Sequence, residues 1–173
     1  MTWLTGGRCG KYHRLDVDEI LPGVFISGCA PAADKALLQR LQITHIVNMA
    51  SLFGNKFPES FSYFRIEIED NEDEEIKSHF YKVFSFIEKS LNVGGRVLVH
   101  CNAGVSRAGT MVTAYVMKSK GSSLKDALKF VRSKRQNNPT IPNDGFMKEL
   151  KKFEKQLSDK ISCQTSVFPY KPQ

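Results

Sequence analysis

One stretch, residues 96–110, constrains the fold more than any other, and it has the sequence RVLVHCNAGVSRAGT. It opens with aliphatic residues typical of a buried strand, passes through a short segment containing Gly104, and continues as an apolar helical pattern through residue 117. A strand that leads through a glycine-containing loop to a helix N-terminus creates a site for an anion. We therefore expect the rest of the chain to be organised around this strand, loop and helix.

The loop has a distinctive chemistry because Cys101 stands at its start and Arg107 at its end. Between them, five backbone N–H groups can surround one anion, those of Asn102, Ala103, Gly104, Val105 and Ser106. The helix that follows adds roughly half a positive charge at its N-terminus, and Arg107 adds a planar group suited to two phosphate oxygens. These effects favour a thiolate, so we expect an exposed, oxidisable Cys101 with a pKa lowered from about 8.5 into the range of about 3.5–7.5.

The remaining sequence alternates strand and helix patterns. We predict strands at 24–26, 43–48, 61–68 and 96–99, and helices at 32–41, 76–91, 106–120, 122–135 and 144–157, with turns at 20–23 and 28–31. This alternation predicts an α/β fold with a central, mostly parallel sheet and helices on both faces. Within the 173 residues we expect a flexible leader at 1–17, one domain at 18–157 and a C-terminal tail at 158–173.

The composition indicates the cellular compartment and bears on metal binding and membrane insertion. The four cysteines are scattered and show no zinc-ligand spacing, which favours a reduced intracellular compartment and predicts neither a metal nor a cofactor. The sequence shows no signal pattern and no apolar run long enough to span a bilayer. We expect a cytoplasmic protein, with the nucleus as a further location and no membrane insertion. A redox role for Cys29 is left open.

The net charge of +7 is unevenly distributed. An acidic run occupies residues 67–75, so the rest of the chain is more basic, especially between Lys118 and Lys160. A basic surface can attract acidic, phosphorylated substrates or can simply be solvated. No basic and aromatic stripe typical of a nucleic-acid module is present, so we expect no nucleic-acid partner.

The segment His100-Cys101-(five residues)-Arg107 resembles the active-site signature of the protein tyrosine phosphatase superfamily, and its full sequence resembles the dual-specificity branch. The resemblance extends over residues 18–157. It implies that Cys101 attacks phosphorus, that Arg107 and the loop N–H groups hold the phosphate, and that a carboxylic acid protonates the leaving oxygen. It also implies a shallow cleft that accepts phosphotyrosine, phosphoserine and phosphothreonine, because the deep phosphotyrosine-recognition loop of the larger enzymes is not found.

The family pattern selects Asp70 as the acid among the seven carboxylates of residues 67–75, with Asp73 as the alternative. The residues that match the family's spacing around the acid are Tyr63, Ile66, Asp70, Ile76 and Phe80. The expected mechanism has a phosphocysteine intermediate and a bell-shaped rate profile on the mildly acidic side of neutral.

We also assign expected roles to three further positions near the loop. His100 is expected to order the loop or to be a satisfied core histidine. Asn143 is expected to contact the loop or to cap the helix at Asp144. The family usually has serine or threonine where this chain has Ala108, and that hydroxyl stabilises the departing thiolate, so its loss predicts slower breakdown of the intermediate unless Ser106 or Thr110 replaces it.

The expected partners are phosphorylated proteins, including kinases of a signalling cascade. Two other functions stay open at this stage. One is hydrolysis of phosphoinositides or RNA 5′ ends, which the uncharged residues 102–106 disfavour. The other is a scaffold that binds phosphoproteins with little turnover, which Ala108 keeps open.

Overall fold

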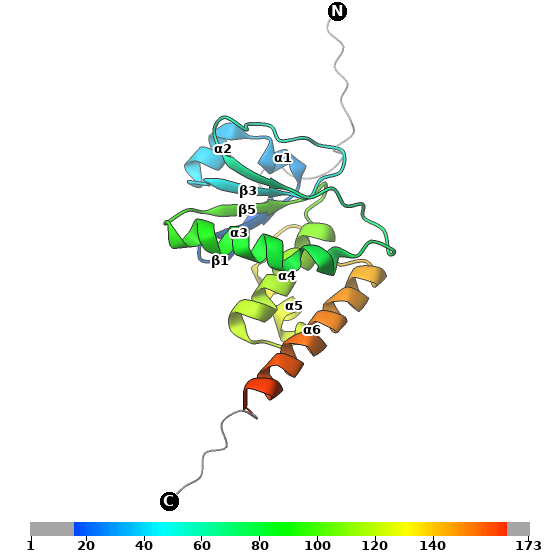
Figure 1. Ribbon diagram of the computed structural model, residues 1–173. Coiled ribbons are helices and arrows are strands. Elements are labelled where there is room, and N and C mark those ends of the chain that lie inside the picture. Colours follow the sequence, from blue (N-terminus) through cyan, green and yellow to red (C-terminus); the bar gives the residue numbers. More distant parts are fainter. Residues whose placement is uncertain (1–15, 166–173) are drawn as a thin grey trace, which may run out of the picture.

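The computed structural model describes residues 16–165, with side chains placed through residue 160, and its centre is a five-stranded sheet (Figure 1). The order is β1-β2-β5-β3-β4, and the strands are β1 (Val17–Leu21), β2 (Val24–Ser27), β3 (His45–Asn48), β4 (Ser62–Arg65) and β5 (Val97–His100). β1 is antiparallel to β2, whereas all other neighbours are parallel. The predicted mostly parallel α/β sheet is confirmed.

β5 lies in the middle of this sheet, between β2 and β3, and all four of its residues are buried. Its register places Val99 opposite Ile26 on one side and Val47 on the other. A parallel strand covered on both faces needs apolar residues throughout, which explains the uninterrupted aliphatic run. Because parallel strands end at the same edge, the segments after β2, β3, β4 and β5 meet there.

Helices cover both faces of the sheet unequally (Figure 1). One face carries the short helices α1 (Cys29–Ala32) and α2 (Lys35–Arg40) over a small apolar cluster. The other face carries most of the core, formed with η1 (Ile76–His79), α3 (Phe80–Asn92), α4 (Arg107–Lys120), α5 (Leu124–Lys134) and α6 (Asp144–Thr165). The helical layers were predicted; the greater thickness of one of them was not.

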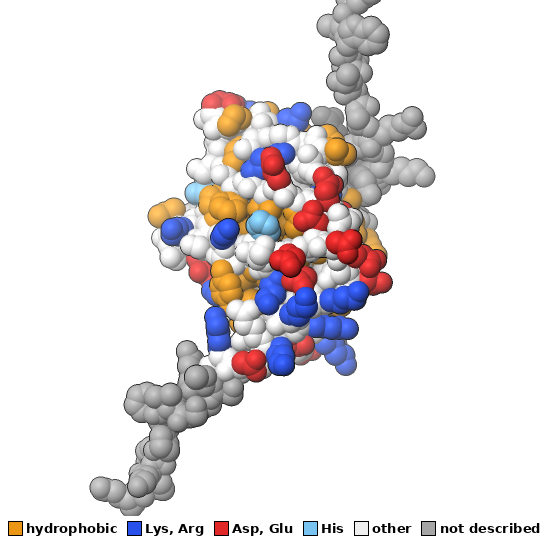
Figure 2. Space-filling view, turned by 45° about the vertical axis from the view of Figure 1, so that its right-hand side comes forward, with side chains coloured by type: hydrophobic (Ala, Val, Ile, Leu, Met, Phe, Trp, Pro, Cys, Tyr) orange, Lys and Arg blue, Asp and Glu red, His pale blue; other side chains and the backbone are white. Residues whose placement is uncertain are grey.

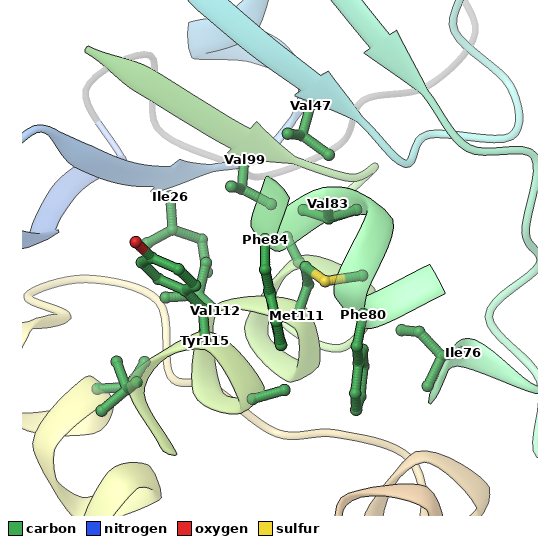
Figure 3. Close-up of a cluster of buried hydrophobic side chains, with 14 of the residues drawn as sticks. Ile26, Val47, Ile76, Phe80, Val83, Phe84, Val99, Met111, Val112 and Tyr115 are labelled. Atoms are coloured by element: carbon green, nitrogen blue, oxygen red, sulfur yellow. The ribbon is translucent and has the colours of Figure 1, made fainter. Parts of the chain in front are cut away.

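α4 is the central helix of the thick layer, since every residue from Arg107 to Met117 is buried. Figure 3 shows Met111, Val112 and Tyr115 lying among side chains from the sheet and from α3. The helix ends as predicted at Gly121, which has a left-handed φ of 59°. Surrounded on all sides, α4 holds its N-terminus in a fixed position behind the loop that precedes it.

The ends of the domain differ from the prediction. Asp16 is buried and Val17 begins β1, so the last residues assigned to the leader belong to the fold; residues 1–15 lie outside the described part. α6 continues past residue 158 to Thr165, so the start of the expected tail is helical. The turn expected at 28–31 largely coincides with α1, a single helical turn with Gly28 as its N-cap. The division into one domain otherwise stays a prediction.

Candidate active site

Cys101 follows β5 directly and lies at the base of the loop formed by residues 102–106. The Gly104 N–H donates a hydrogen bond to its Sγ at 3.2 Å. Only 1% of Cys101 is exposed, so the expectation of an exposed thiol is wrong.

The loop is fixed from behind through four consecutive backbone carbonyls. From Asn102 to Val105, they accept hydrogen bonds from the Cys29 N–H at 3.0 Å, Asn138 Nδ2 at 2.6 Å, Arg135 Nη2 at 3.4 Å and the Ile141 N–H at 3.1 Å. In a planar trans peptide, the N–H points opposite to the carbonyl of the same unit. The N–H groups of residues 103–106 are therefore directed to the other side, as an anion cradle requires.

Two glycines allow the loop to pack against the end of β2. Gly104 has a left-handed φ of 76°, and a Cβ there would lie 2.6 Å from the carbonyl carbon of Ser27. At Gly28, a Cβ would lie 3.1 Å from the Asn102 oxygen. A side chain at position 104 would clash with the end of β2, whereas one at position 28 would displace the Asn102 and Ala103 backbone by a few tenths of an ångström.

Arg107, the first residue of α4, is 3% exposed. Its Nη1 donates to the carbonyl oxygens of Met49 and Ile68, both at 3.1 Å, and to Ser51 Oγ at 3.2 Å. Its Nε lies 3.5 Å from Asp70 Oδ2 and is buried without a hydrogen-bond partner. The guanidinium is thus held by the segments after β3 and β4 and retains a donor that is not used within the described chain.

Asp70 is placed beside the loop by contacts from two other elements. Its Oδ1 accepts hydrogen bonds from Ser106 Oγ at 2.7 Å and from Asn143 Nδ2 at 3.0 Å. The Asn143 N–H also donates to Ser106 Oγ at 3.2 Å. The structure therefore brings Asp70, Ser106, Arg107 and Asn143 together, and Asn143 also accepts from the Phe146 N–H at the start of α6. Of the two acid candidates, Asp70 is the one that contacts Arg107 and Ser106.

The acidic segment that carries Asp70 rests on the first turn of α6. A Cβ on Gly145 would lie 2.0 Å from the Glu72 oxygen, so the two backbones are in close contact. Asn143 Nδ2 adds a hydrogen bond to the Asn71 oxygen at 3.2 Å. The position of Asp70 therefore depends on the sequence of α6, more than seventy residues further along the chain.

His100 is 4% exposed, and burial lowers its pKa to about 4. Its imidazole is consequently neutral near pH 7, and its Nδ1 has no hydrogen-bond partner within the described residues. A neutral ring at this position is consistent with a supporting role for His100 in ordering the loop.

Ala108 is fully buried at the base of α4. The two hydroxyls considered as replacements are otherwise engaged: Ser106 Oγ donates to Asp70, and Thr110 Oγ1 donates to the Ser106 carbonyl at 2.8 Å. Within the described chain, neither hydroxyl donates to the Cys101 sulfur.

The buried charged cluster that contacts the carbonyl side of the loop was not predicted from the sequence. Arg135 forms ion pairs with Asp16 at 3.3 Å and with Asp18 at 3.1 Å, and all three side chains are buried. Burial raises the pKa of Asp18, although Arg135 opposes this effect. The available signal was the pair of carboxylates on either side of Val17, but residues 16 and 17 had been assigned to the leader.

A hollow of about 290 Å³ opens beside Arg107 and is lined by Ser51, Arg65, Glu67, Ile68, Glu69 and Glu74. Two of these residues, Ser51 and Ile68, bind the Arg107 guanidinium. The hollow next to the residues that bind Arg107 thus carries three glutamates and one arginine.

Between residues 16 and 165, no three His, Cys, Asp or Glu side chains are grouped as metal ligands. None of the helices in this part of the chain combines the length and apolarity needed to cross a bilayer.

Comparisons with known proteins agree on one family. Residues 24–156 match the model described as the dual specificity phosphatase catalytic domain. Dual specificity protein phosphatase 1B of Arabidopsis thaliana is 38% identical over 142 residues, which cover 82% of this chain and 84% of the plant protein. Human dual specificity protein phosphatase 2 is 40% identical over 150 residues, 87% of this chain but 47% of the human protein. The chain therefore spans most of one relative and about half of the other.

Solved structures show the same likeness. The human tyrosine phosphatase-like serine/threonine/tyrosine-interacting protein has a TM-score of 0.76 and 35% identity, covering 81% of this chain and 96% of that one. A mouse putative dual specificity phosphatase, solved with zinc tungstate, has a TM-score of 0.79 and 28% identity, covering 88% of this chain and 94% of that one.

Proposed function

This chain belongs to the dual specificity phosphatase family, a family of protein-phosphatase hydrolases, and on that premise we propose that it hydrolyses phosphotyrosine and phosphoserine or phosphothreonine in proteins through a phosphocysteine intermediate. Cys101 is the nucleophile, Asp70 is the acid and base, and Arg107 binds the phosphate together with the N–H groups of the loop. The observation that carries this proposal is the loop whose carbonyls are tied behind it, because that arrangement directs four N–H groups toward one anion beside the Cys101 sulfur.

In the first step, the Cys101 thiolate attacks phosphorus and forms an S–P bond while the P–O bond to the leaving group breaks. Asp70 gives its proton to the departing oxygen. Ser106 and Asn143 hold the Asp70 carboxyl group near that oxygen. Arg107 and the N–H groups of residues 103–106 bind the equatorial oxygens, whose charge is greatest in the transition state.

In the second step, Asp70 removes a proton from water, and the resulting hydroxide attacks phosphorus. The S–P bond breaks, inorganic phosphate is released and the Cys101 thiolate returns. Since Ala108 supplies no hydroxyl to the departing sulfur, this step is expected to limit turnover. His100 remains neutral and takes no proton.

The direct test is hydrolysis of a small aryl phosphate by the wild type, Cys101→Ser and Asp70→Asn. We expect Cys101→Ser to be inactive and Asp70→Asn to lose the alkaline limb of the rate profile for substrates with poor leaving groups, because the general acid must be protonated to act. Equal rates for the wild type and Cys101→Ser would remove Cys101 from the reaction.

A second candidate is a phosphoprotein-binding role with little turnover. It is favoured by Ala108 and by the likeness to a human protein whose name describes it as phosphatase-like and interacting. A wild type that binds phosphopeptides as tightly as Cys101→Ser but does not hydrolyse them would establish it. Phosphoinositides and RNA 5′ ends are not favoured, since the relatives reported above are named protein phosphatases.

The substrates we propose are phosphorylated proteins in the cytoplasm or nucleus, with kinases of a signalling cascade among them. The positive charge of the chain supports this class of substrate, because it attracts acidic partners.

A further inference from the structure

A second hollow, of about 400 Å³, lies between η1 and α6, away from the Cys101 loop. Its lining consists of Lys77, Lys152, Lys155, Gln156, Asp159 and Lys160. Four lysines against one aspartate give it a strongly positive character. In Figure 2, basic side chains gather on this side of the molecule directly below the acidic group.

The four lysines are not equally neutralised by the protein. Lys152 forms an ion pair with Glu149 at 2.6 Å, and Lys160 lies over the Tyr81 ring at 4.8 Å from its centroid. Lys77 and Lys155 have no ion pair to any residue between 16 and 160. Positive charge is therefore available to a ligand that enters the groove.

The position of the groove can be measured along α6. This helix begins at Asp144, next to the Asn143 that binds Asp70, and it rises about 1.5 Å per residue. Lys152 and Lys160 thus lie about 12 and about 24 Å from the active-site end of the helix. An extended peptide covers about 3.3–3.6 Å per residue, so this distance corresponds to roughly four to seven residues.

The acidic segment lies between the active site and the groove. Glu67, Glu69 and Glu74 line the hollow beside Arg107, and the same segment packs on the first turn of α6. Acidic residues directly next to a phosphorylated residue would meet these carboxylates and be repelled. Acidic residues further away would meet the lysines of α6 instead.

We propose, building on the protein-phosphatase function, that this groove binds an acidic segment of the phosphoprotein substrate located about four to seven residues from the phosphorylated residue. A single extended peptide can cross the acidic segment with uncharged residues and bring its own acidic residues against the lysines. A broad polyanion such as a membrane surface or a nucleic-acid duplex would bring negative charge against the acidic segment, which disfavours both.

The test uses phosphopeptides of equal net charge that carry three glutamates either next to the phosphorylated residue or five residues from it. The wild type is compared with K152E/K155E and with the control K125E/K129E, which makes the same charge change on exposed residues of α5. Hydrolysis of an aryl phosphate is measured for all three proteins. Peptide binding is measured in parallel by fluorescence anisotropy.

We expect the wild type to prefer the distant placement by about tenfold in kcat/KM at low salt, with the preference falling as salt rises. K152E/K155E should lose that preference, while K125E/K129E should keep it and both should hydrolyse the aryl phosphate normally. Equal use of the two peptides, or an equal loss in both variants, would overturn the proposal, as would binding of anionic vesicles that depends on these lysines without any peptide preference. A wild type that binds the distant-acid peptide through Lys152 and Lys155 but hydrolyses nothing would refute the phosphatase function. The proposal that the groove binds an acidic segment would still stand.

Discussion

Two buried arginines adjoin the same loop, Arg107 at its end and Arg135 through the Gly104 oxygen, and their charges are balanced in different ways. Arg107 is bound by two carbonyls and a hydroxyl, and the carboxylate nearest to its Nε, that of Asp70, lies at 3.5 Å. Arg135 is paired with two buried carboxylates at 3.3 and 3.1 Å and binds the Gly104 oxygen from behind.

The comparison shows that a structural arginine is neutralised by buried carboxylates, whereas an arginine available for binding is not fully neutralised. The charge of Arg135 is neutralised inside the protein, so this residue can fix the loop but cannot attract a ligand. Arg107 retains an unused buried donor, and a buried polar group without a partner is unfavourable unless a ligand uses it. Phosphate is the ligand that we propose for this position.

The most severe test of this comparison is Arg107→Lys. The ammonium group keeps the charge but cannot bind two phosphate oxygens in a plane, so we expect kcat/KM for an aryl phosphate to fall about 10³-fold, as for other groups that stabilise a transition state. The melting temperature should fall modestly, because a lysine ammonium replaces only some of the hydrogen bonds to the Met49 and Ile68 oxygens. Wild-type kinetics in this variant would contradict the role given to Arg107.

Arg135→Met should show the opposite pattern, with a large loss of stability and a smaller effect on kcat/KM. It leaves Asp16 and Asp18 buried without their partner, and we expect a loss of about 3–5 kcal/mol in the free energy of unfolding, measured by urea denaturation. The variant D16N/D18N/R135M removes all three charges and should recover part of this stability. If the triple variant were as unstable as the single one, the ion pairs would not explain the effect.

His100 provides a third buried base in the same region, one that stays uncharged. Its pKa is about 4 in the folded protein and about 6.5 when unfolded, so the unfolded state binds more protons between these values. Its contribution to stability is complete above pH 6.5 and is lost as the pH falls toward 4, by about 3 kcal/mol. Denaturation at several pH values should show a shallower dependence for His100→Asn than for the wild type, and identical slopes would rule out this assignment.

The smallest expected effect concerns the residue beside Arg107. Ala108→Ser supplies a hydroxyl to the departing sulfur, and we expect breakdown of the intermediate to accelerate by about tenfold, the equivalent of one hydrogen bond to a charged group. Pre-steady-state kinetics with an aryl phosphate measure this step separately. An unchanged rate of breakdown would show that the absence of this hydroxyl does not slow the second step in this chain.

The sequence predicted the parts of the fold whose signal is local. The strand at β5, the loop and the end of α4 at Gly121 all follow from short patterns, and the structure has them. The antiparallel β1 was missed because its residues alternate weakly and its end overlaps the turn expected at 20–23. The extension of α6 to Thr165 was missed because its last turns are polar.

The residues of the site were likewise predictable where a local motif contains them, and its long-range contacts were not. Cys101, Arg107 and Asp70 were selected from the signature and the family spacing, and the structure brings the latter two within 3.5 Å. The network of Arg135, Asp16 and Asn138 joins segments more than a hundred residues apart, and no local pattern reports such pairing. Burial of the Cys101 sulfur likewise depends on the packing of the whole loop against β2.

The most direct measurement of the central claim is mass spectrometry of Asp70→Ala quenched during turnover of para-nitrophenyl phosphate. That leaving group departs without an acid, whereas the second step still needs a base, so the intermediate should accumulate. The account predicts a phosphoryl group on Cys101. Continued turnover with phosphorus on another side chain, or with none bound to the protein, would contradict it.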